Sequence, residues 1–143
     1  MAITQAMATS FKVQLLNGQQ NFSSNTFKLA LYTSSATLNE NTTAYTTSNE
    51  VASTGNYSAG GNTLTVSVTP TNSGNVAYIS FANTSWANST ITAAGALIYN
   101  NTNSNSAVCV LSFGGDKTST NGTFAINFPT ADATNAIIRL TAS

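Results

Sequence analysis

Short alternations of apolar and polar residues, separated by turn residues, constrain the fold of this chain more than any other feature. The clearest is TLTVSVT at 63–69, in which Leu64, Val66 and Val68 alternate with Thr and Ser. A period of two places every second side chain on the same face of a β-strand. We expect strands here and at six other segments, which are 27–33, 76–82, 90–100, 107–113, 123–129 and 136–141. Residues 49–58 are a candidate for a short eighth strand.

The breaks between these segments have the composition of turns. They include Gly60-Gly61-Asn62, Pro70 with the polar run 72–75, the polar stretch 100–106, Gly114-Gly115-Asp116 and Asn121-Gly122. No helical segment separates the strands, which favours antiparallel neighbours. The pattern predicts a mainly β fold, an antiparallel β-sandwich or jelly-roll-like barrel of 7–8 strands with one N-terminal helix.

The expected helix covers residues 4–17, with Thr4 as its N-cap and Asn17-Gly18 at its end. Its apolar stripe has a helical spacing and consists of Met7, Phe11 and Leu15, with Leu16 beside them. Two interpretations are open: an amphipathic helix packed on its own sheet, or an arm that reaches a neighbouring subunit. We therefore expect an N-terminal arm and helix at 1–20 and a single β-sandwich domain at 21–143.

Residues 31–50, LYTSSATLNENTTAYTTSNE, are rich in Ser, Thr and Asn but carry only two charges, Glu40 and Glu50. This stretch follows a strand, and its Thr content is compatible with extended structure. We expect a long surface excursion that Leu38 and Tyr45 pin to the body of the protein.

Charged residues make up 6% of the 143 residues, against about 25% in ordinary globular proteins. They are Lys12, Lys28, Lys117 and Arg139, with Glu40, Glu50, Asp116 and Asp132. Nucleic-acid and anionic-membrane binding both need clustered Lys and Arg, so we expect neither partner. A near-neutral, Ser/Thr/Asn-rich surface suits a subunit whose neighbours are fixed and crowded, although a secreted or glycan-binding module has a similar composition.

The chain has no His, which removes the commonest general base and most zinc sites. Asp116 and Asp132 are interpreted as turn residues rather than calcium ligands. We expect no enzyme activity, catalytic residue, metal or cofactor. The start MAITQAMATSFKVQLL lacks the pattern of a secretory signal, and no apolar run is long enough to span a bilayer.

Two side chains have alternative interpretations. Trp86, within ANTSWANST, is either a core plug at one end of the sandwich or an exposed ring that stacks on a sugar or fills a pocket on a partner. Cys109 lies in the apolar run AVCVLSF, where we expect a buried and inert thiol.

The order of several segments along the chain resembles a family of small virion proteins of tailed bacteriophages, including phages of marine and cyanobacterial hosts. The segments are MAITQAM, TFKLALYTSSATLN, TLTVSV, GALIYN, FGGDK and AIIRL, and the resemblance extends from Met1 to Leu140. The chain departs from the family pattern at two positions, Gln20, where the pattern has His, and Ala94, near which it has a basic residue. The family supplies no catalytic residues.

The resemblance implies a structural protein located in the virion. The first expectation is a capsid decoration, or cement, protein that bridges subunits of the major capsid protein and forms a homo-oligomer. The alternative is a tail, collar or fibre component, with host-glycan binding as one role for it. A free lectin-like module is a third and weaker hypothesis. The residues expected to contact partners are Ile3, Met7, Phe11, Tyr45 and Trp86, with 39–49 and 100–106 as outward loops.

Overall fold

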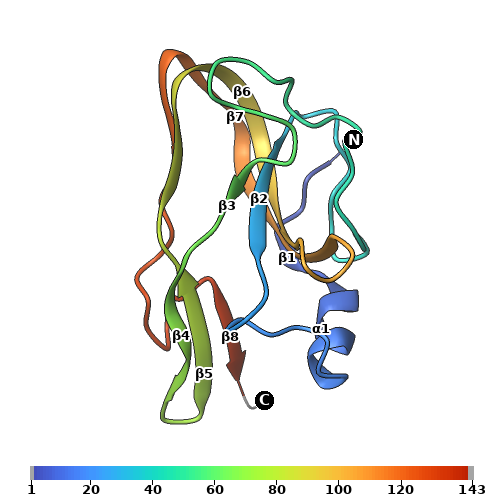
Figure 1. Cartoon of the computed structure of the whole chain (residues 1–143), viewed down its shortest axis with the longest axis vertical. Coiled ribbons are helices and arrows are strands. Elements are labelled where there is room, and N and C mark those ends of the chain that lie inside the picture. Colours follow the sequence, from blue (N-terminus) through green and yellow to red (C-terminus); the bar gives the residue numbers. More distant parts are fainter. Residues whose placement is uncertain (1, 142–143) are drawn as a thin grey trace.

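The computed structural model describes residues 2–141 and is mainly β, with 51% of residues in strands and 6% in a helix. Figure 1 shows the elements in space. In chain order they are β1 (Ala6–Met7), α1 (Thr9–Leu16), β2 (Phe27–Tyr32), β3 (Asn62–Thr63), β4 (Val66–Ser73), β5 (Val76–Phe81), β6 (Thr84–Asn100), β7 (Ser106–Ile126) and β8 (Ile138–Thr141). Met1 and residues 142–143, at the ends of the expected arm and body, lie outside the described residues.

The strands form two antiparallel sheets, which confirms the predicted fold class. The large sheet has the order β1-β7-β6-β2-β3, and the small sheet has the order β4-β5-β8. The predicted strand 63–69 is divided between them, because Asn62–Thr63 pairs with β2 and Val66–Ser73 pairs with β5. The predicted eighth strand at 49–58 is wrong, since this segment makes only the isolated bridges Tyr32–Glu50 and Thr54–Tyr57.

The hairpin of β6 and β7 is much longer than the sequence suggested. Two expected strands, 107–113 and 123–129, are largely one strand, and the two turns placed between them do not reverse the chain. Gly114 and Gly115 adopt positive φ angles of 75° and 140° within a wide bulge, where Ala93 opposes Lys117 but Gly95 opposes Ser112. Figure 1 shows the hairpin of β6 and β7 arching at the top of the view, so that its two halves lie on different sides of the fold.

The N-terminal helix is shorter than predicted. Residues before Thr9 are extended because β1 pairs with β7, and the N–H of Ala8 donates to the carbonyl of Val108 at 2.9 Å. Thr4 is therefore not the N-cap; Ala8 occupies that position and makes no side-chain capping bond.

The end of α1 agrees with the prediction. Gly18 adopts the left-handed conformation at φ 71°. The N–H of Gln19 donates to the carbonyl of Gln14, and the N–H of Gly18 to that of Leu15, as in a Schellman motif. The end of the helix thus follows from local sequence, whereas its start is determined by the pairing of β1 with β7.

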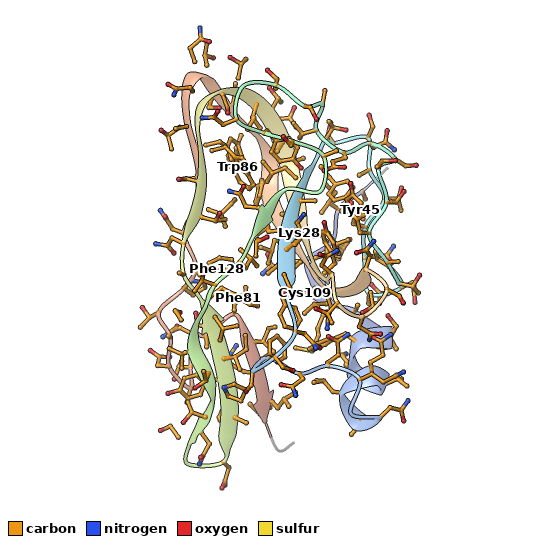
Figure 2. The ribbon with its side chains drawn as sticks, in the orientation of Figure 1. Lys28, Tyr45, Phe81, Trp86, Cys109 and Phe128 are labelled. Carbon is orange, nitrogen blue, oxygen red and sulfur yellow. The ribbon has the colours of Figure 1, made fainter. Side chains whose placement is uncertain are left out.

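Aromatic rings connect α1 and the two sheets. Phe22 stacks on Phe27 of β2 with ring centroids 4.5 Å apart and meets Phe11 of α1 edge-on at 6.0 Å. Phe81 of the small sheet lies 5.9 Å from Phe27 and 5.8 Å from Phe128, and Figure 2 shows Phe81 and Phe128 close together. This contact between the sheets forms one continuous apolar core.

The excursion between β2 and β3 covers the large sheet. Leu38 is buried, and the ring of Tyr45 stacks on Tyr99 of β6 with centroids 4.7 Å apart, so both predicted pins are confirmed. Five of the six residues of β2 are buried, including neighbours that point to opposite faces. The hydroxyl- and amide-rich stretch is therefore a covering layer over β2, which is buried on both faces.

Candidate functional site

A cluster of tyrosine hydroxyls surrounds the carboxylate of Glu50. Tyr45 donates to Oε2 at 2.7 Å, and Tyr57 donates to Oε1 at 2.8 Å. The backbone N–H of Gly60 donates to the same Oε1 at 2.7 Å. We call Glu50, Tyr45, Tyr57 and Gly60 the Glu50 cluster. It ties three parts of the excursion to one another, since its members are separated in the sequence but meet at one carboxylate.

Two further tyrosines fasten the excursion to the large sheet. Tyr99 of β6 donates to the carbonyl of Gly60 at 2.7 Å, and Tyr32 of β2 donates to the carbonyl of Thr46 at 2.6 Å. Hydroxyl donors therefore hold the covering layer on the sheet.

Burial, followed by the nearby Glu50 carboxylate, raises the pKa of these phenols. The pKa values of Tyr45 and Tyr57 lie well above the ordinary value of 10.0, first through desolvation and then through their bonds to Glu50. Desolvation also raises the pKa of Tyr99 to about 12. The hydroxyls are therefore protonated donors at neutral pH.

The expected partner-contacting residues occupy different environments. Phe11 and Trp86 are buried, with exposed fractions of 0% and 2%. Ile3 and Met7 are half-buried against the core, and the methyl groups of Ile3 lie over Gly95. Tyr45 is half-buried in the Glu50 cluster. The structure thus does not bring these five side chains together on one surface.

Trp86 belongs to the core, as one of its two interpretations predicted. Its ring centroid lies 5.4 Å from that of Tyr57 and 6.4 Å from that of Phe124. Figure 2 shows it on the inner side of the arched hairpin. Its Nε1 is buried without a hydrogen-bond partner among the described residues. The indole is therefore not available to stack on a sugar.

The exposed apolar side chains were mostly missed by the sequence analysis. Within residues 2–141, the large exposed ones are Leu16 at 90%, Val13 at 53% and Leu140 at 49%. Val13 and Leu16 are three residues apart on α1 and share a helical face, which we call the α1 face. The sequence analysis placed Leu16 beside the apolar stripe of Met7, Phe11 and Leu15, but Leu16 is exposed.

A groove lies between the end of α1 and the small sheet, with a cavity volume of about 240 Å³. We call it the apolar groove. One wall is formed by Leu15 and the segment 20–22, and the floor by the small sheet. Its sheet residues are Pro70, Thr71, Ala77, Tyr78, Ile79, Ile138 and Leu140. Since none of the lining residues is charged, the groove suits apolar groups.

Cys109 is buried and Asp132 lies in a turn, as the sequence predicted for each. Within residues 2–141, no three His, Cys, Asp or Glu side chains gather in one place. Burial raises the pKa of the Cys109 thiol to about 12, which agrees with the inert thiol predicted. Asp132 accepts bonds from the N–H groups of Thr134 and Asn135, as expected of a turn residue. Among residues 2–141, no helix has the length and apolar character needed to cross a membrane.

Comparisons of the chain with protein-family models, with curated proteins and with solved structures give no match.

Proposed function

We propose that the chain is a structural protein of a tailed-bacteriophage virion, and specifically a capsid decoration protein that bridges capsid subunits. The proposal starts from the resemblance of six segments between Met1 and Leu140 to small virion proteins. The structural observation that supports it is the α1 face, where Leu16 is 90% exposed on a surface with few charged residues. An apolar side chain held in water by a fixed helix is stabilised when a partner covers it.

The N-terminal segment fits an attachment role through the rigidity of its surroundings. The N–H of Thr4 donates to the carbonyl of Leu38, and that of Thr9 donates to the carbonyl of Glu40, both at 2.8 Å. The α1 face is thus presented on a segment fixed to the covering layer. A preformed surface loses less conformational entropy on binding than a flexible arm. Many modest contacts of this kind, repeated by symmetry, strengthen a shell through multivalency.

The alternative is a tail, collar or fibre component that binds host glycan, and the burial of Trp86 weakens it. Its strongest residue was Trp86, which is 2% exposed. The number of copies in purified particles separates the two candidates. On the order of hundreds of copies supports decoration, and a few dozen or fewer supports the tail or neck.

The test of attachment uses Leu16→Ser together with Val13→Ser in the complete chain. Burying one Leu contributes about 1.5–3 kcal/mol, so we expect occupancy of purified particles to need at least roughly tenfold more protein. Lys12→Ser is the matched control, because Lys12 is also exposed on α1. Unchanged attachment of the double variant, or absence of the parent chain from washed particles, overturns the proposal.

A further inference from the structure

The edge strand β8 differs from the other strands at the sheet edges. At the opposite edge of the small sheet, β4 contains Pro70 and two register shifts against β5. The edge strands of the large sheet, β1 and β3, have two residues each. Proline, bulges and short length are the features that protect sheet edges from pairing. Strand β8 is also short and carries one charged residue, Arg139, but it pairs with β5 in unbroken register from Ile138 to Thr141 and contains no proline.

Alternate residues around β8 line two different grooves. Ile138 and Leu140 line the apolar groove beside α1. Ile137, Arg139 and Thr141 line a second groove of about 330 Å³, which we call the inter-sheet groove. Its other wall consists of Gln5 and of residues of the large sheet, which are Ala6, Met7, Cys109, Val110 and Leu111. A strand added at the free edge of β8 would continue both faces of the small sheet, so its side chains would enter the two grooves alternately.

The charges at these grooves define what such a strand can carry. The apolar groove has no charged lining residue, and Arg139 is the one charged residue of the inter-sheet groove. Arg139 contributes only weakly to the lowered pKa of Asp132, which is caused mainly by hydrogen bonds from Asn135 and Thr134. The exposed guanidinium of Arg139 therefore has the capacity to pair with a carboxylate on a partner.

We propose that β8 accepts one extended segment of a neighbouring virion subunit as an added strand. Every second side chain of the segment is apolar and enters the apolar groove. One of the side chains between them carries a carboxylate, which faces Arg139 in the inter-sheet groove. The four residues of β8 match a segment of about four to six residues at roughly 3.3 Å per residue. The walls formed by α1 and by the large sheet favour a single strand over a whole second sheet. This inference rests on the proposed virion role.

The experiment compares hydrogen exchange of the complete chain, free and attached to phage particles, by mass spectrometry. Strand addition gives the outward amides of β8 new hydrogen bonds, so we expect exchange in 136–141 to slow at least tenfold on attachment. Exchange in β4, at the opposite edge of the same sheet, is expected to stay unchanged. If the chain is bound to particles but 136–141 exchanges as in the free chain, the strand proposal is overturned and the virion role survives. If the chain is absent from particles, both fall.

Substitutions identify the groove and the occupant. Leu140→Asp places a charge at the apolar groove, so we expect attachment to weaken at least tenfold, whereas Ser73→Asp on the exposed end of β4 leaves it unchanged. Equal effects of the two substitutions overturn the proposal. A photoreactive residue at Thr141 is expected to cross-link to a different virion subunit. Cross-linking to a second copy of this chain overturns the assigned occupant.

Discussion

The hydroxyl of Tyr57 joins Glu50 to strand β2 of the large sheet. It donates to Oε1 of Glu50 at 2.8 Å and accepts the backbone N–H of Leu31 at 2.9 Å. The carbonyl of Leu31 accepts the N–H of Val51 at 2.9 Å. Beyond its short pairing with β3, the outer side of β2 is therefore completed by the excursion. Through Tyr57, the Glu50 cluster takes part in the hydrogen bonding of the backbone of β2.

Replacing Glu50 with Ala leaves the Tyr45 and Tyr57 hydroxyls and the Gly60 N–H without their acceptor. Each unsatisfied, largely buried donor costs about 1–3 kcal/mol, less where water reaches it, so we expect the free energy of unfolding to fall by about 2–4 kcal/mol. Urea denaturation measures this change. The control is Glu40→Ala at an exposed position, which should stay within about 0.5 kcal/mol of the parent. Similar losses for both variants would refute the role of the cluster.

Gly61 and Gly18 have nearly the same backbone angle, φ 72° and 71°, but different surroundings. A Cβ at Gly61 would lie 1.7 Å from the carbonyl oxygen of Leu29, whereas nothing lies within 4 Å of one at Gly18. We expect Gly18→Ala to cost about 1–2 kcal/mol from backbone strain alone. Gly61→Ala should cost at least about 3 kcal/mol, because β2 or the excursion must move. Thermal unfolding of the two variants measures the difference, and equal melting temperatures would contradict the packing described.

Trp86 is expected to tolerate Phe much better than Ala. Its Nε1 has no hydrogen-bond partner among residues 2–141, so Phe gives up ring volume but no bond. Trp86→Ala also leaves a cavity beside Tyr57 and Phe124 and should cost about 3–5 kcal/mol, against roughly 1–2 kcal/mol for Phe. Chemical denaturation gives the two values. A Phe variant as unstable as the Ala variant would show that the indole N–H makes a contact of its own.

Alkaline pH should unfold the chain through its tyrosines. Burial raises the pKa of Tyr32, Tyr45 and Tyr57 well above 10.0, and that of Tyr99 to about 12. Between pH 10 and these raised values the unfolded chain has lost phenolic protons that the folded chain keeps. The free energy of unfolding is therefore fully retained below pH 10 and falls as the pH rises above it. Tyrosinate absorbance and circular dichroism recorded together should change in one transition; ionisation of these phenols near pH 10 in a folded chain would disprove their burial.

Strands β2 and β5 could be predicted because each is a short run of residues that favour strands, bounded by turn residues. The segments 27–33 and 76–82 match β2 and β5 within a residue at each end. The helix could not be placed correctly, because residues 4–8 fit a helical pattern as well as an extended one. Their conformation is decided by Val108, which is distant in the sequence and offers its carbonyl to Ala8.

The long hairpin was missed because turns and bulges use the same residues. Gly114, Gly115 and Asn121 all have positive φ, and a tight turn requires this as much as a bulge does. The Glu50 cluster was missed for a related reason. In the sequence, Glu50 is only one of two charged residues in a polar stretch. Tyr45, Tyr57 and Gly60 reach its carboxylate because the excursion folds back on itself, and no local pattern predicts this.

The arched β6–β7 hairpin also bears on the order in which the chain folds. Its strands are joined by residues 101–105, so its contacts close a small loop and form early at little entropic cost. The pairing of Ala6 with Val110 instead joins distant parts of the chain. Newly made chains should therefore acquire the hairpin first and dock the N-terminal strand late, so that the α1 face is presented only on molecules that have finished folding.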